Sequence, residues 1–464
     1  MCRSRWADIA RCAIIVLLLG RGAAASLSSC EEYGNNEDID ARLAGYETSF
    51  PHLARREIIG QSVAGADIHA LFVSTDPAQD AAKPEVRVVG GIHGNECLAT
   101  EMVLQIIASL LDGAAVDPMS RRLVEHLQFV FVPLVNPDGH DRVPAERLNA
   151  SGIDLNRNFG YAWTPVPDHG SSPFSEPETR ALRDLSQSRA FVLGLSYHTR
   201  ADYVNGPWDW TPFHPRDEEL IAAIGADYAG ASDYQVVFGW DWYQISGDID
   251  DWSLGTAGTF DWTIELQSDA ELQWDVHGPG VVAFFEWALR GVEGTVTDAE
   301  TGQPLPAMIT VEPEGEPVFT DPDGGDYHRM LLEGTYEITA WANGYAALTV
   351  DNVVVPSGGT VTVDFALTPD DCRSAFRVNA MTQPRDLTNH WYATNGYDNT
   401  TLPSDALGRR DDWYYSLGGG SLTLDLGEAL DDGDGADLTV VSGTGSSDQV
   451  RVFVAAHQDG PFME

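Results

Sequence analysis

The sequence predicts an α/β domain with a mixed, mostly parallel sheet and helices on both faces, followed by two all-β sandwich modules. Three observations support this fold class. Apolar runs typical of buried strands alternate with helix-like segments in the first part of the chain. After residue 290 the pattern changes to short alternating strands separated by glycine-rich turns. The length of 464 residues is sufficient for several domains.

The first part of the chain contains three runs typical of buried strands, at 85–91, 127–134 and 191–197. Apolar periodicity predicts helices at 99–111 and 281–289. Strands that alternate with helices pair mostly in parallel, and ligands bind at the loops that follow such strands. We therefore assign 26–290 to one domain and expect its site at those loops.

The second part of the chain is rich in turn signals, and strands are expected at 307–311, 336–342 and 360–366. This spacing predicts a small β-sandwich over 291–369. A further β-rich, jelly-roll-like module is expected over 370–464, and it stops soon after a strand, as a truncated module would. Four of its aromatic side chains are candidates for stacking on sugar rings, although aromatic residues also fill cores: Trp391, Trp413, Tyr414 and Tyr415.

The N-terminus is typical of an export signal. Three arginines precede an apolar stretch at 13–20, and small residues follow as far as Ala25. We expect a signal peptide over 1–25 and a protein that is secreted, periplasmic or attached to the cell surface. The LSSC run that ends at Cys30 offers an alternative, a lipid anchor on Cys30, but Arg21 interrupts the path to it.

Removal of the signal would leave Cys30, Cys97 and Cys372. Three cysteines are too few for a disulfide scaffold, and an odd number leaves at least one unpaired. We therefore expect a protein that does not depend on disulfides, with Cys97 as a packing residue.

Charge and hydropathy exclude some partners. Acidic residues outnumber basic ones by 71 to 27, giving a formal charge of −44, which repels nucleic-acid phosphates. The only long apolar run lies near the N-terminus, so we expect no transmembrane helix in the mature chain. We expect a monomer.

A metal site is suggested by the HGNE run directly after the first buried strand. His93 and Glu96 are three residues apart, so both side chains can reach one ion from the same side. Catalytic zinc takes three protein ligands and a water molecule, and His198, at the end of the third strand run, supplies the third ligand. The alternative for a single HxxE pattern is a capped helix start. We expect one zinc ion per chain.

Other polar residues cluster on the predicted loops. Arg157 lies in a DLNRNF run, and its planar fork suits carboxylate recognition; the alternative is a surface pair with Asp154. Glu265 lies in an otherwise apolar strand-like run, so it either faces a cleft at the strand end or is buried with a partner.

Six motifs occur in order over 39–290: HGNE, NPDG, ERLNASGIDLNRNF, a strand that ends in His, WYQISGDIDDW and WTIEL. This set resembles the zinc metallocarboxypeptidases of the pancreatic carboxypeptidase fold. The motifs GTVTD, TGQPL and GTY within 291–369 resemble the transthyretin-like domain of the regulatory carboxypeptidase N and E branch.

The resemblance implies a role for each polar residue. His93, Glu96 and His198 would bind zinc, and Glu265 would be the general base. Arg147 would stabilise the oxyanion. Asn156 and Arg157 would hold the terminal carboxylate of the substrate, and Tyr243 would close over the bound peptide.

Two acids occupy positions that line the specificity pocket in the family. Asp250 follows Tyr243 by seven residues, and Asp209 follows His198 by eleven, within NGPWD. By resemblance, acids at these positions select Lys or Arg. The alternative is that Asp209 caps a turn and that Asp250 is a loop acid paired with arginine or water.

These observations predict an exported zinc-dependent metallocarboxypeptidase that removes single C-terminal residues, Lys or Arg, from peptides by attack of zinc-activated water. Its partners would be peptide or protein C-termini, with a glycan or cell-surface ligand for the C-terminal module. One alternative on the same fold is a zinc amidase or deacylase, or an enzyme that trims peptidoglycan stem peptides. Another is an inactive, glycan-binding adhesion protein.

Overall fold

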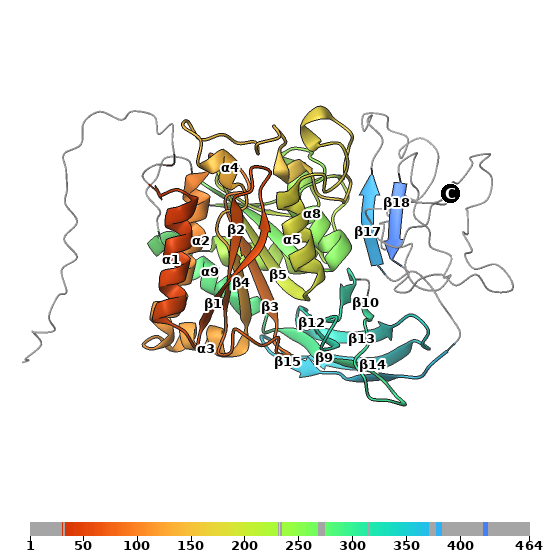
Figure 1. The fold of residues 1–464 in the computed structure, drawn as a ribbon. Coiled ribbons are helices and arrows are strands. Elements are labelled where there is room, and N and C mark those ends of the chain that lie inside the picture. The colour runs from red at the N-terminus through yellow and green to blue at the C-terminus, as the bar shows by residue number, and fades with distance from the viewer. Residues whose placement is uncertain are drawn as a thin grey trace, which may run out of the picture.

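A computed structural model describes residues 30, 33–230, 232, 234–267, 274–313 and 315–370, together with the backbone of two strands at 377–382 and 421–425. Its first part is built on an eight-stranded sheet in the order β1-β2-β4-β3-β5-β8-β6-β7 (Figure 1). The strands are β1 (Ala54–Gln61), β2 (Asp67–Val73), β3 (Glu85–Val89), β4 (Gln128–Val132), β5 (Phe191–Thr199), β6 (Tyr203–Gly206), β7 (Gln235–Phe238) and β8 (Phe260–Leu266).

The central strands of this sheet are parallel. β3 pairs in parallel with β4 and β5, and β5 pairs in parallel with β8. β2 is antiparallel to β4, and β6 is antiparallel to β8. Every residue of β3, β4, β5 and β8 is buried, which explains their apolar sequences, because parallel strands are covered on both faces. The predicted mixed, mostly parallel sheet is confirmed.

Helices lie on both sides of the sheet (Figure 1). They are α1 (Asn36–Ser49), α2 (Cys97–Ala114), α3 (Pro118–His126), α4 (Pro137–His140), α5 (Pro177–Gln187), α6 (Glu218–Ala229), α7 (Gly239–Trp242), α8 (Ile249–Trp252) and α9 (Trp274–Trp287). Among the described residues, α2 alone is long and apolar enough to cross a membrane, and half of it is buried inside the protein. Its contacts with β3, β4 and β5 are those of a core helix.

The second part is a β-sandwich that lies below the first sheet in Figure 1. One of its sheets has the order β11-β10-β13-β14, and the other has the order β12-β9-β15, with β16 also paired to β9. The strands are β9 (Gly291–Asp298), β10 (Met308–Glu312), β11 (Val318–Phe319), β12 (Asp326–Arg329), β13 (Gly334–Trp341), β14 (Leu348–Val355), β15 (Thr360–Thr362) and β16 (Phe365–Leu367). The Asp217 carboxylate connects the two parts by accepting hydrogen bonds from Arg329 Nη2 and from the Glu316 amide, each 2.6 Å long.

Beyond the sandwich, β17 (Arg377–Thr382) and β18 (Ser421–Asp425) form an antiparallel pair. The rest of the predicted C-terminal module, including its four aromatic candidates, lies outside the described residues. The predicted signal peptide and its cleavage site also lie outside them. The domain boundaries at 25, 290 and 369 therefore stay predictions.

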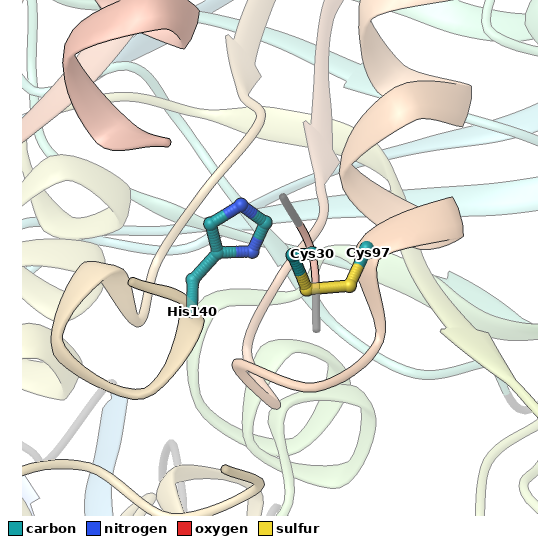
Figure 2. Close-up of side chains that lie close together, drawn as sticks. All are labelled: Cys30, Cys97 and His140. Atoms are coloured by element: carbon teal, nitrogen blue, oxygen red, sulfur yellow. A yellow bond between two sulfur atoms is a disulfide. The ribbon is translucent and has the colours of Figure 1, made fainter. Parts of the chain in front are cut away.

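One expectation about the cysteines is wrong. Cys97, the first residue of α2, forms a disulfide with Cys30, and their Cα atoms are 5.5 Å apart (Figure 2). Cys97 is therefore a cross-link and not a packing residue. The lipid alternative for Cys30 is also corrected, since a sulfur atom in a disulfide cannot form the thioether that holds the lipid.

Candidate active site

A cleft of about 190 Å³ opens where β3, β5 and β8 end. The side chains predicted as site residues come from segments far apart in the sequence, and all of them line this cleft: His93, Glu96, Arg147, Asn156, Arg157, His198, Asp209, Tyr243, Asp250 and Glu265. Their convergence follows from the parallel strands, whose carboxyl ends meet at one edge of the sheet.

Three of these side chains form a candidate metal centre. His93 follows β3, Glu96 lies at the start of α2, and His198 is near the end of β5. The His93 and His198 Nδ1 atoms are 3.0 Å apart, and each lies 3.0 Å from an oxygen of Glu96. The alternative reading as a helix cap is wrong, because the Glu96 side chain makes no capping hydrogen bond.

The Nε2 atoms of the two histidines contact outer partners, and their Nδ1 atoms face Glu96; Arg147 Nη1 also lies 3.1 Å from His93 Nδ1. His93 Nε2 donates to Asp154 Oδ1 at 3.1 Å, and His198 Nε2 lies 3.2 Å from Ser196 Oγ. Two imidazole nitrogens and a carboxylate that meet in this way are able to hold one cation, which would take the place of Arg147 at His93 Nδ1. Two nitrogens and one carboxylate are also a ligand set of catalytic zinc, with one position left for water. The residues present therefore fit a zinc ion.

Asp154 is a residue of the centre that the sequence analysis did not identify. We interpreted it only as an alternative partner of Arg157, but its carboxylate binds His93 on one side and Arg147 Nε on the other, at 3.0 Å. Such outer partners orient metal ligands and fix their tautomers. In the sequence, the feature that could have indicated this role is the position of Asp154 two residues before Asn156. The structure shows that both residues are buried.

The acids of the metal centre differ in pKa. Burial, the largest single influence, would raise the pKa of Glu96 and of Asp154, but the neighbouring positive groups together hold both pKa values below the ordinary range. These groups are His93 and His198 at Glu96, and His93, Arg157 and Arg147 at Asp154. At Glu265, near the end of β8, the charges of His93, Arg147 and Arg200 also lower the pKa, but they do not outweigh the opposing effects. Burial, and then the charge of Glu96, raise its pKa to about 8. Glu265 can therefore hold and release a proton close to neutral pH.

Three polar side chains gather beside the metal centre. Arg157 Nη1 donates to the Asn156 carbonyl at 2.6 Å, and its Nη2 lies 3.5 Å from the Tyr243 hydroxyl. The Asn156 Oδ1 accepts the amide of Ile249, which fixes its side chain. Tyr243 is 44 % exposed and stands at the mouth of the cleft. On the other side, Arg147 Nη1 lies 3.5 Å from Glu96 Oε1.

We call the part of the cleft lining that contains His93, Glu96 and His198 the metal end, and the separate part that contains buried aspartates the acidic end. Asp209 and Asp250 are almost fully buried, and the structure adds Asp248, which the sequence analysis did not identify. Asn205 donates to Asp209 Oδ1 at 3.1 Å, so Asp209 does not cap a turn as in the alternative reading. A Cβ atom on Gly239 would lie 1.9 Å from Asp209 Oδ1, so only glycine leaves room for this carboxylate.

Among the described residues, the carboxylates of these acids are only partly satisfied by hydrogen bonds, and their pKa values are raised. Asp248 Oδ2 and Asp250 Oδ1 are buried without a hydrogen-bond partner there. Burial, and then the charge of Asp248, raise the pKa of Asp209. Burial, and then the charge of Asp261, raise the pKa of Asp250. A cation that entered this end of the cleft would relieve both effects.

Comparisons with known proteins agree with this geometry. A zinc carboxypeptidase family model matches residues 39–281, and a carboxypeptidase regulatory-like domain model matches residues 291–368. The carboxypeptidase N catalytic chain of Mus musculus is 30 % identical over 390 residues, covering 71 % of this chain and 85 % of that protein. Carboxypeptidase D of Rattus norvegicus is 28 % identical over 370 residues, and the match covers 71 % of this chain but only 26 % of that longer protein.

A solved structure shares the fold. The crystal structure of thrombin activatable fibrinolysis inhibitor aligns with a TM-score of 0.50 and 21 % identity, covering 56 % of this chain and 76 % of that one. At this identity the match supports the fold alone. On the two family models and the carboxypeptidase N match, this chain belongs to the zinc carboxypeptidase family.

Proposed function

We propose that this protein is an exported zinc-dependent metallocarboxypeptidase that removes a single C-terminal Lys or Arg from peptides. The observation that carries the proposal is the division of one cleft into two ends. One end holds His93, Glu96 and His198 with Glu265 nearby, and the other holds buried acids. The N-terminal segment with its signal-like pattern supports export.

The chemistry at the first end begins with water. His93, Glu96 and His198 would hold a zinc ion, which would supply Lewis-acid chemistry: it would make water acidic at pH ~7 and would polarise the carbonyl of the scissile bond. Glu265 accepts the proton of the attacking water and passes it to the leaving amine, and its raised pKa suits both transfers. Arg147, beside Glu96, donates to the oxyanion that forms in the transition state.

Arg157 and Asn156 recognise the C-terminal residue of the substrate by its free carboxylate. The Arg157 guanidinium offers two parallel donors to the free carboxylate of the substrate. Tyr243 lies within 3.5 Å of that guanidinium and covers the bound residue. An internal peptide bond presents no carboxylate here, so the proposed activity is that of an exopeptidase.

The preference for Lys or Arg rests on the acidic end. Asp209, Asp248 and Asp250 line the cleft and are buried, and an acid in a low-dielectric site is stabilised by a cation that enters with the substrate. A neutral side chain such as Phe would leave these acids without a counter-charge.

The test compares two peptides with the same sequence that end in Arg, one with a free carboxylate and one amidated. The full chain is assayed with its zinc, after treatment with a chelator and after zinc is restored. We expect release of Arg from the free acid only, loss of release with the chelator, and recovery with zinc. Equal rates on both peptides would favour an amidase, and no release from either would favour an inactive adhesion protein; both results would overturn the proposal.

A further inference from the structure

A second group of potential metal ligands includes Cys97, the residue that follows Glu96 in the chain (Figure 2). It comprises Cys30, which precedes α1, Cys97, the first residue of α2, and His140, the last residue of α4. The two sulfur atoms and a ring nitrogen of His140 all lie within 4.8 Å of one another. Cys30 and His140 are buried, with 3 % and 2 % of their surface exposed.

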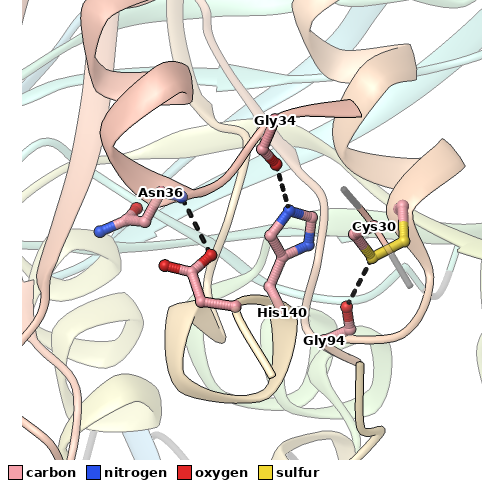
Figure 3. Close-up of a disulfide and its surroundings, with 7 residues drawn as sticks. Cys30, Gly34, Asn36, Gly94 and His140 are labelled. Atoms are coloured by element: carbon pink, nitrogen blue, oxygen red, sulfur yellow. Dashed lines mark hydrogen bonds between the residues drawn. A yellow bond between two sulfur atoms is a disulfide. The ribbon is translucent and has the colours of Figure 1, made fainter. Parts of the chain in front are cut away.

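The two ring nitrogens of His140 differ in their surroundings. Its Nε2 donates to the Gly34 carbonyl at 2.9 Å, so the neutral ring carries its lone pair on Nδ1 (Figure 3). Nδ1 lies on the side of the ring that faces Cys30, and it is buried without a hydrogen-bond partner among the described residues. Because the sulfur atoms of a disulfide carry no hydrogen, the disulfide cannot satisfy this lone pair. A buried acceptor that lacks a partner is costly and calls for an explanation.

We propose that Cys30, Cys97 and His140 form a second metal site, which the disulfide closes and reduction opens. A dithiol reductant breaks the S–S bond, supplies two electrons and two protons to the two sulfurs, and itself becomes a disulfide. A divalent metal ion then displaces both thiol protons, and the two thiolates balance its charge. His140 Nδ1 is the third ligand, and its lone pair is satisfied.

The ligand set determines the metal class. Two thiolates and one imidazole select a borderline-soft ion such as Zn²⁺ or Co²⁺ over Mg²⁺ or Ca²⁺, which prefer oxygen. The hydrogen bond from His140 to Gly34 is the outer contact that fixes the tautomer of a metal-binding histidine. Cys30 Sγ also lies 3.4 Å from the Gly94 carbonyl, so the backbone of the HGNE segment packs against the site (Figure 3).

This site is chemically distinct from the catalytic centre. Glu96 and Cys97 are consecutive, but the Glu96 carboxylate meets His93 and His198 whereas Cys97 meets Cys30. The catalytic ligands include no sulfur. A sulfur-to-metal absorption band therefore does not arise from the catalytic centre, and the Cys30→Ser, Cys97→Ser double variant separates the second site from other thiols. The proposal does not depend on the catalytic function.

The experiment uses the full chain after removal of metal, as an oxidised sample and as a sample reduced by a phosphine under anaerobic conditions. The phosphine becomes a phosphine oxide, and water provides the oxygen and the two thiol protons. Both samples are desalted and titrated with Co²⁺. We expect about one Co²⁺ per oxidised chain without a sulfur-to-cobalt charge-transfer band, and about two per reduced chain with that band. A folded reduced chain, judged by circular dichroism, that shows no band would overturn the proposal.

Two variants assign the ligands. His140→Gln keeps an amide that can donate to the Gly34 carbonyl but lacks the Nδ1 lone pair, so the reduced variant should bind the second Co²⁺ at least ~10-fold more weakly. His126→Gln, which replaces an exposed histidine at the end of α3, is the matched control and should bind as the unchanged chain does. Unchanged affinity in His140→Gln would exclude His140 as a ligand. A band that persists in a Cys30→Ser, Cys97→Ser double variant would arise from another thiol and would also overturn the proposal.

Discussion

The pKa values of the acids are shifted in opposite directions at the two ends of the cleft. At the metal end, Glu96 and Asp154 meet imidazole and guanidinium groups of the same chain, and their pKa values are lowered. At the other end, burial raises the pKa values of Asp209 and Asp250, and two carboxylate oxygens there lack a partner among the described residues. Under the proposed function, the zinc ion belongs to the first end, and the second end receives the cationic side chain of the substrate.

The largest expected effect is a loss of turnover at the metal end without a loss of zinc. Glu265→Ala should keep its zinc, because Glu265 is not a ligand, and should lose ~3 kcal/mol or more of transition-state stabilisation through the missing base. Zinc content by elemental analysis and kcat on a peptide ending in Arg measure the two effects. Glu300→Ala, on an exposed turn after β9, is the control. Turnover close to that of the unchanged chain would refute the role of Glu265.

The next effect concerns the acidic end alone. Asp209→Asn should lower kcat/KM on a peptide ending in Arg by roughly 30-fold or more, about 2 kcal/mol, because a buried charge pair with the substrate is lost. Zinc content and kcat/KM on the same peptide ending in Phe should not fall. Asp241→Asn serves as the control, since that acid is exposed near the cleft. If both peptides lost activity equally, Asp209 would have a structural role only.

A smaller effect is expected when Asp154, the hydrogen-bond partner of His93, is replaced. Asp154→Asn removes the charge that orients His93, so zinc affinity should fall by roughly 10- to 100-fold. Competition with a fluorescent zinc chelator measures this affinity. At saturating zinc, the ratio of kcat/KM for Arg and Phe termini should stay the same; a changed ratio would mean that the two ends are coupled.

The smallest effect is a dependence of substrate preference on pH. Asp209, Asp248 and Asp250 have raised pKa values, mainly through burial, so they keep protons at a higher pH than ordinary aspartates do. Protonated acids cannot pair with a guanidinium, so KM for the Arg peptide should fall several-fold as pH rises from about 5 to about 8. The KM for the Phe peptide is the control for the titration of Glu265, and it should not fall over this pH range. A KM for Arg that rose with pH would contradict the account.

Local sequence patterns predicted the sheet and placed polar residues on the loops that follow its strands, whereas Arg147, Asn156, Tyr243, Asp209 and Asp250 were assigned to the site by resemblance to a family. His93 and His198 could be predicted to converge since each ends a buried strand run. The disulfide could not be predicted in this way, because Cys30 and Cys97 are 67 residues apart and their contact depends on how the segment before α1 packs. Asp248 was missed for a related reason: its burial beside Asp209 depends on the path of the loop before α8.

The measurement that tests the central claim most directly is kcat/KM for two peptides that differ only in their terminal residue, Arg or Phe, with and without a zinc chelator. We expect release that the chelator abolishes and a preference for Arg of roughly 100-fold, about 2.7 kcal/mol. Chelator-sensitive release of Phe at an equal or higher rate would contradict the assignment of the acidic end as a pocket for a cation.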